Sequence, residues 1–144
     1  MSSIKHLFHI NTPREKVFKT LTTVDGIANW WTVETNGDAK EGGTLEFRFK
    51  NEFKTILKVT NTVDNEIVNW TCTGGPEDWI NTKITFHLDD HDSKTRVRFE
   101  HSGWKEQNDF YAQCSYYWGA FMESLRQYCQ KGIGEAFGSP NYRI

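Results

Sequence analysis

The segment from Phe110 to Tyr128 constrains the fold more than any other, because its apolar residues, nearly all of them large, recur at helical spacing. These residues are Phe110, Cys114, Tyr117, Trp118, Phe121, Leu125 and Tyr128. Most polar residues of the segment fall on the opposite side. The pattern predicts an amphipathic helix from about Asp109 to Lys131, which would be roughly 35 Å long at 1.5 Å per residue.

Segments in which apolar and polar residues alternate precede this helix. Such alternation is typical of β-strands that have one face in water. The first of them opens the chain, where Ile4, His6, Phe8 and Ile10 share a face. Five more follow, in residues 45–49, 53–63, 67–73, 81–88 and 96–101. Short turns separate most of these five segments, so we expect an antiparallel meander.

Two short helices are expected between the first strand and the meander. In a capping-box pattern, Thr12 caps a helix that begins at Pro13, and Glu15 stands three residues after the cap. The Asp-Gly pair at residues 25–26 is expected to end this helix. Residues 27–31, which include two tryptophans, suggest a second helical turn or two.

The elements therefore run strand, two short helices, a glycine-rich loop around residues 36–43, five strands and one long helix. This is the order of the helix-grip fold, an α+β architecture in which a curved antiparallel sheet wraps around a long C-terminal helix. We predict one domain over residues 1–144, because this length suffices for one core and no linker, repeat or low-complexity segment interrupts it. Large rings between a helix and a concave sheet leave gaps more readily than small aliphatic side chains do, and such a gap could hold a ligand.

Composition narrows the function classes. The net charge of −2 and the isoelectric point near 6.2 argue against a general nucleic-acid binder or a protein that binds anionic membranes. No run of apolar residues is long enough to span a bilayer, and the N-terminus lacks a secretory pattern. The three cysteines are widely spaced and odd in number, which favours reduced thiols in a cytoplasmic protein.

Five short motifs carry a resemblance to a known family. They are Ile10–Phe18 followed by Trp30-Trp31, Gly43–Phe47, Asn69–Thr71, Thr95–Gly103, and Tyr117–Gly119 followed by Leu125. Their order along residues 4–131 resembles that of the START-like (SRPBCC) superfamily, in the branch related to the activator of Hsp90 ATPase homologue 1-like C-terminal domain. Phe121 departs from the pattern, since it stands near a position where leucine is common.

This resemblance implies a hydrophobic cavity between the sheet and the long helix, which the superfamily uses for lipids, polyketides or plant-type small hydrophobic molecules. The residues predicted to contact a ligand there are Trp30, Trp31, Phe47, Phe49, Trp70, Phe86, Phe99, His101, Tyr117, Trp118, Phe121 and Leu125. Trp79 and Trp104 could also rim the opening. The resemblance implies no activity, and the chain has no room for the separate N-terminal domain of the eukaryotic Hsp90 activators.

His101 is the polar residue of greatest interest, because alternation places it on the inward face with Val97 and Phe99. A buried histidine must pair its ring nitrogens or lose about 1–3 kcal/mol for each unsatisfied group. Three roles stay open for it: a structural histidine bonded within the core, a contact to a ligand, or an acid–base group. Tyr117, Trp118, Asn69 or a bound ligand could provide the partner.

We predict no catalytic residue, no cofactor and no metal site. His87 and residues 89–92 contain potential metal ligands, but their spacing matches neither a helix-borne pair nor a calcium loop. This segment is predicted to be a solvated hairpin. The sequence also has no glycine-rich phosphate loop and no nucleophile placed beside a base.

Three functions follow as hypotheses. The leading one is non-catalytic binding of a small hydrophobic molecule, lipid-like or polyketide-like, in the cytoplasm. The second is a polyketide cyclase or dehydratase-like enzyme in which His101 and Tyr117 act as acid and base. The third is a chaperone-related interaction role of the Hsp90 ATPase activator type.

Overall fold

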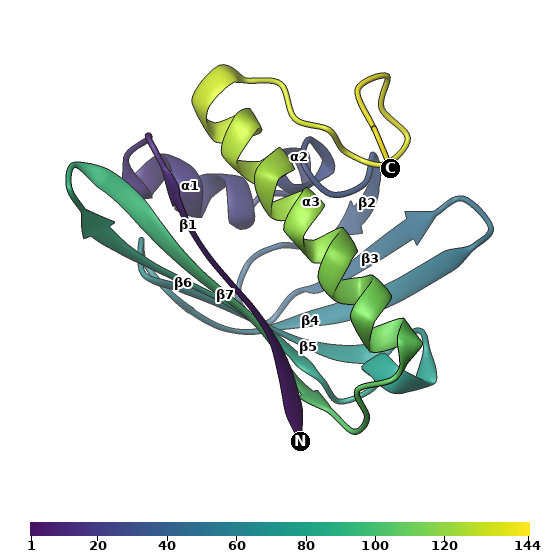
Figure 1. Cartoon of the computed structure of the whole chain (residues 1–144). Helices are drawn as coiled ribbons and strands as arrows, with labels where there is room; N and C mark the ends of the chain where they lie inside the picture. Colours follow the sequence, from purple (N-terminus) through teal and green to yellow (C-terminus); the bar gives the residue numbers. More distant parts are fainter.

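The computed structural model describes residues 1–144 and has a curved seven-stranded antiparallel sheet with one long helix across its concave face (Figure 1). The elements are β1 (Ser2–Ile10), α1 (Arg14–Leu21), α2 (Val24–Ala28), β2 (Glu34–Gly37), β3 (Thr44–Phe49), β4 (Phe53–Val63), β5 (Ile67–Gly74), the short 3-10 helix η1 (Glu77–Trp79), β6 (Lys83–His91), β7 (Lys94–Trp104) and α3 (Asp109–Lys131). The strand order is β1-β7-β6-β5-β4-β3-β2. The predicted α+β helix-grip fold is confirmed.

Helix α3 has the predicted bounds, and both of its ends are capped. At its start, the side-chain oxygen of Asn108 accepts a hydrogen bond from the backbone N–H of Tyr111 at 2.9 Å. At its end, Gly132 adopts a left-handed conformation with φ of 80°, and its N–H donates to the carbonyl of Tyr128. These caps satisfy backbone groups that the helix itself leaves unpaired.

The predicted capping box at the first helix is wrong. Pro13 occupies the N-cap position, and no side chain caps the helix. The Thr12 hydroxyl instead donates to the carbonyls of Asn11 and Cys129, the latter near the end of α3. A tertiary contact has therefore taken the hydroxyl that the local pattern assigned to a cap.

The end of the first helix also differs from the prediction. Residues 25–26 lie inside α2, whose N-cap is Thr23, with its hydroxyl oxygen accepting from the N–H of Gly26 at 3.1 Å. A Cβ at Gly26 would lie 2.4 Å from the carbonyl oxygen of Thr20. This glycine therefore permits α2 to pack against the end of α1 and does not interrupt a helix.

Strand β2 was not predicted, because the sequence indicated a loop there. Its four residues pair with β3, from Glu34 opposite Arg48 to Gly37 opposite Leu45. The strand is short, polar and at the edge of the sheet, so it has too few residues for alternation to reveal it. Neither the predicted meander nor the other strands change as a result.

Aromatic rings fill the space between the middle of α3 and the central strands. Ring centroids of Trp70 and Phe86 lie 5.2 Å apart, those of Phe86 and Phe99 5.3 Å, and those of Phe99 and Trp118 4.6 Å. Trp30 is also fully buried and meets Phe86 edge-on. This interior is solid.

None of the three α-helices has the length and apolar character needed to cross a bilayer.

Candidate functional site: an aromatic cleft beside the long helix

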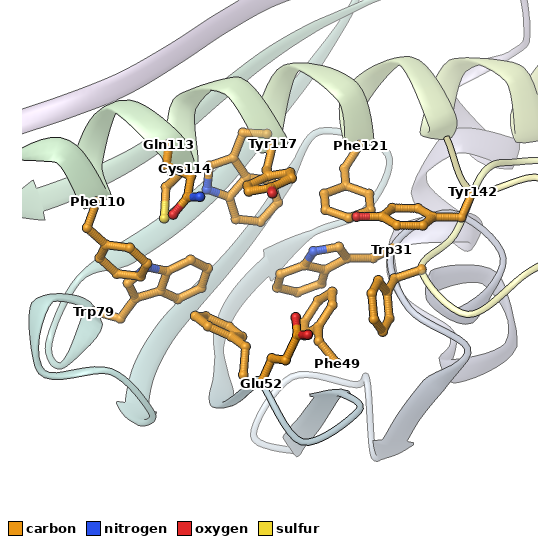
Figure 2. A pocket seen from close by; sticks show the side chains of 13 residues that line it. Trp31, Phe49, Glu52, Trp79, Phe110, Gln113, Cys114, Tyr117, Phe121 and Tyr142 are labelled. Atoms are coloured by element: carbon orange, nitrogen blue, oxygen red, sulfur yellow. The ribbon is translucent and has the colours of Figure 1, made fainter. Parts of the chain in front are cut away.

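A cleft of about 290 Å³ lies next to this solid interior and is partly open to solvent. It lies between the first half of α3, the β3–β4 turn, η1 and the C-terminal tail (Figure 2). The residues that line it are Trp31, Phe49, Glu52, Phe53, Trp79, Phe110, Gln113, Cys114, Tyr117, Trp118, Phe121, Phe137 and Tyr142. Its volume is close to the lower end of the range for small-molecule sites, roughly 300–1,000 Å³.

Helix α3 forms one wall, because side chains three or four residues apart project from the same face. Figure 2 shows Phe110, Cys114, Tyr117 and Phe121 projecting from this helix toward the cleft. The same periodicity that buries Trp118 in the core therefore also provides the cleft with a row of apolar side chains. The row begins at the first turn of the helix, with Phe110.

Trp31 connects the cleft to the core. It is only 2% exposed, and its ring centroid lies 4.3 Å from that of Phe47 and 5.0 Å from that of Trp118. Its ring is also nearly parallel to that of Trp70. The backbone holds it from both sides, since its N–H donates to Ile27 and its carbonyl accepts from a residue of the C-terminal tail. The cleft therefore has a rigid wall at this position.

The C-terminal tail closes another side of the cleft. Phe137 pairs through its backbone with Trp31 and Val33, at 2.8 and 3.0 Å. Tyr142 then lies over the opening, with its ring 5.0 Å from that of Phe137 and stacked 6.3 Å from that of Phe121. An ion pair between Arg143 and Glu135 ties the end of the tail to its beginning.

Few polar groups reach the cleft. Eleven of the thirteen lining residues are hydrophobic, and the other two are Glu52 and Gln113. Burial raises the pKa of the Tyr142 hydroxyl, and the neighbouring Tyr117 and Glu52 raise it further. All three of these oxygen-bearing residues line the cleft. Burial raises the pKa of the Cys114 thiol to about 11, so it is protonated at neutral pH.

The predicted ligand-contacting residues divide into two groups. Five line the cleft: Trp31, Phe49, Tyr117, Trp118 and Phe121. Seven lie in the solid core and do not line it: Trp30, Phe47, Trp70, Phe86, Phe99, His101 and Leu125. Periodicity placed Phe47, Phe86, Phe99, His101 and Leu125 on inward faces, and all five are buried. It contains no information on whether an inward side chain meets another side chain or an open space.

Eight lining residues were not in the predicted set. Phe110 and Cys114 had a signal, because both belong to the apolar stripe of the long helix, and Trp79 was noted as a possible rim residue. Glu52 and Phe53 lie in a predicted turn and at the start of a predicted strand, without any pattern that singles them out. Gln113 lies in the predicted helix, but on the side that was expected to be polar, and it nevertheless lines the cleft. Phe137 and Tyr142 lie in a segment without periodicity, so no local signal could have placed them here.

His101 is bonded within the core. The indole N–H of Trp118 donates to its Nδ1 at 3.1 Å, so its proton belongs on Nε2. Nε2 then donates to the Thr82 hydroxyl at 2.8 Å, and this hydroxyl donates to the carbonyl of Trp79 at 2.5 Å. Both ring nitrogens are satisfied, as the structural role requires.

This environment leaves His101 without access to a substrate. The residue is fully buried, with the rings of Trp79 and Trp104 centred 4.5 and 5.1 Å from its own. Burial lowers its pKa to about 3, so it is neutral near pH 7 and a poor proton acceptor. The geometry does not favour the acid–base role that the enzymatic hypothesis gave it.

The histidine- and aspartate-rich segment forms the β6–β7 hairpin, as predicted. The carboxylate of Asp89 pairs with the guanidinium of Arg96 at 2.7 Å, and hydrogen bonding from Arg96 lowers the pKa of Asp89 to about 2. Across residues 1–144, no three His, Cys, Asp or Glu side chains gather in a group that could hold a metal ion.

Comparisons with known proteins agree with this architecture. The chain is similar to the Aha1 dimer from Colwellia psychrerythraea, with 40% identity over 93% of this chain and 100% of that one, and a TM-score of 0.85. SSP2350 from Staphylococcus saprophyticus shares the fold at 18% identity, with 92% and 95% of the two chains covered and a TM-score of 0.76.

CalU16 from Micromonospora echinospora also shares the fold, with 15% identity, 91% and 67% of the two chains covered and a TM-score of 0.74. No protein of curated function matches the sequence. The family described as activator of Hsp90 ATPase homolog 1-like protein matches residues 11–130. With this match and the 40% identity to the Colwellia protein, the chain belongs to the activator of Hsp90 ATPase homolog 1-like family.

Proposed function

We propose that this protein binds a small hydrophobic molecule in the cleft beside α3. The observation that carries the proposal is a cleft of about 290 Å³ lined mainly by aromatic rings, directly beside an interior in which ring packs against ring. Apolar surface that leaves water gains about 25 cal/mol per Å². A ligand that covers these rings would therefore gain affinity mainly from burial.

The shape of the cleft favours a small compound with a planar part. Trp79 and Trp118 stack with their planes 21° apart, and Trp31 lies 34° from Trp118, so flat surfaces border the space. Stacked and edge-on contacts to such rings add about 0.5–1.5 kcal/mol beyond burial. The proposal is binding without turnover, because the inward-facing His101 already has both nitrogens bonded.

Heteronuclear NMR offers a direct test, because the six tryptophans provide an internal control. Trp31, Trp79 and Trp118 line the cleft, whereas Trp30, Trp70 and Trp104 do not. Titration with small aromatic compounds is expected to shift the indole signals of the first three residues most. Equal shifts at all six, or none with a panel of planar hydrophobic compounds, would count against the proposal.

Two neighbouring tyrosines of α3 form a matched pair of variants. Tyr117 lines the cleft, whereas Tyr116 is 68% exposed and does not. We expect Tyr117→Ala to weaken binding by about tenfold through lost ring contact, and Tyr116→Ala to leave binding unchanged. If both variants bind as the parent does, the ligand sits elsewhere.

A second candidate function is interaction with Hsp90. It is favoured by the family description and by the 40% identical Colwellia protein, which is named as an Aha1. The test is the ATP turnover of Hsp90 with and without this protein. Stimulation that saturates with concentration would support the interaction, and unchanged turnover at high excess would remove it.

A further inference from the structure

Glu52 is the only charged residue among the thirteen that line the cleft. It lies in the β3–β4 turn, where its N–H donates to the carbonyl of Phe49 at 3.2 Å. Figure 2 shows its carboxylate turned toward the rings that line the cleft. The side chain takes part in none of the nine ion pairs of the structure.

The basic residues of the adjoining strands are directed elsewhere. Arg48 and Lys54 both pair with Glu46, at 2.7 and 3.7 Å. Glu46 and Arg48 alternate with the buried Phe47 and Phe49, and Lys54 lies opposite Arg48 on the neighbouring strand. They therefore lie on the outer face of the sheet. No lysine, arginine or histidine lines the cleft, so nothing within it would balance an anionic group of a ligand.

The rings around Glu52 suit a positive charge. Trp31, Phe49, Phe53, Tyr117 and Tyr142 share the same lining. The face of an aromatic ring carries partial negative charge, and a cation placed over it gains about 0.5–1 kcal/mol at exposed sites and more where water is excluded. A carboxylate beside several rings is therefore a better partner for an ammonium group than for a neutral head group.

From this arrangement we infer that the cleft selects an organic cation, an aryl- or alkylammonium compound with its charged end at Glu52 and its apolar body against Trp31 and Trp118. This inference rests on the proposed function and adds the charge of its ligand. An ammonium group that carries no phosphate fits better than a phosphocholine head group, because a phosphate would find no cation in the lining.

Three compounds with the same apolar body separate the contribution of ligand charge to affinity from that of apolar burial. They are 4-phenylbutyltrimethylammonium, 4-phenylbutanol and 4-phenylbutyrate, with binding followed by tryptophan fluorescence and by the indole signals. The cation is expected to bind on the order of fivefold more tightly than the alcohol, and the carboxylate more weakly than both. Phosphocholine, which has no apolar body, is expected to bind at least about tenfold more weakly than the cation.

Two variants test the role of Glu52 in the preference for a cation. Glu52→Gln is expected to bring the ratio of affinities for the cation and for 4-phenylbutanol close to one, because it removes the charge and keeps the size of the side chain. Glu66→Gln is the matched control. Glu66 is also an exposed turn residue, but it lies at the far end of β4 and outside the cleft lining, so the preference should persist.

The outcomes separate a failure of the cation inference from a failure of the proposed hydrophobic binding in the cleft. Equal binding of all three compounds, or tighter binding of the carboxylate, would overturn the cation inference and leave the hydrophobic cleft standing. A cation preference that survives in Glu52→Gln would overturn the role of this residue. Phosphocholine binding as tightly as the arylalkylammonium would overturn the preference for an ammonium compound without a phosphate. Absence of binding by all three compounds would overturn both.

Discussion

Two aromatic regions of this protein lie side by side and differ in what their rings do. In the interior, Trp70 is fully buried and meets three rings, those of Trp31, Phe47 and Phe86. In the cleft, Phe110 is only partly buried and borders open space. The inward direction of a ring does not by itself decide whether the ring fills the interior or lines the cleft. The residues that face it from the opposite layer decide this.

The sheet explains why the two regions separate. Opposite the middle of α3, Phe99 of β7 packs against Trp118 of the helix, and Phe86 of β6 and Trp70 of β5 continue this series of contacting rings. Near the start of α3, the opposite side consists of the β3–β4 turn and η1, and the C-terminal tail closes the other end of the space. Turns and loops place rings less densely than paired strands do, so a space remains.

The largest expected effect is the loss of stability when a ring is removed from the interior. Trp70→Ala should lower the free energy of unfolding by about 3–5 kcal/mol, because it removes a fully buried ring and leaves a cavity. Urea unfolding followed by circular dichroism measures this, with Trp70→Phe as a smaller truncation that should cost less. A loss below about 1.5 kcal/mol would mean that the interior repacks freely and is not solid.

The next effect concerns the histidine inside that interior. Because the pKa of His101 is about 3 in the folded protein and near 6.5 when unfolded, the unfolded state binds the proton first as the pH falls. Its contribution to stability is therefore complete above about pH 6.5 and is lost as the pH falls toward 3, at roughly 1.4 kcal/mol per pH unit at most.

His101→Asn removes this titration and keeps hydrogen-bonding capacity. The parent protein should lose stability between about pH 6 and pH 4 more steeply than the variant does. Comparing the two slopes cancels the acid loss from carboxylates such as Asp89, whose pKa is also lowered. Parallel slopes would show that His101 is reached by protons or solvent in the folded state.

A cleft ring should cost less to remove than an interior ring. Phe110→Ala is expected to lower the free energy of unfolding by about 1 kcal/mol, because the ring is only partly buried and solvent can enter its place. The same urea titration compares it with Trp70→Ala. A loss as large as that of Trp70→Ala would erase the distinction between the two regions.

The smallest effect is a difference in reactivity between the cysteines, which tests which of them borders the cleft and which lie in the interior. Cys114 lines the cleft and is 7% exposed, whereas Cys72 and Cys129 are fully buried. Iodoacetamide should modify only Cys114 in the folded protein, and slowly, because its pKa of about 11 leaves little thiolate. Mass spectrometry after digestion reports this, with Cys114→Ser as the control. Equal labelling of all three cysteines would contradict it.

Much of the fold could be predicted from local patterns. Helix α3 and six of the seven strands have long periodic segments, and their apolar residues face inward as the alternation indicates. The features that differed are short or tertiary. Thr12 bonds to Cys129 instead of capping a helix, and β2 has only four residues. A local pattern cannot register a partner that lies more than a hundred residues away.

The sequence by itself determined which side chains turn inward, because helical and strand periods fix direction along one element. Only the tertiary structure decided that Trp70 fills the interior while Trp79 borders a cleft, and that Phe137 and Tyr142 close it. The physical reason is that an empty space is a property of several surfaces at once. It depends on how turns and a tail of no regular pattern are placed against α3.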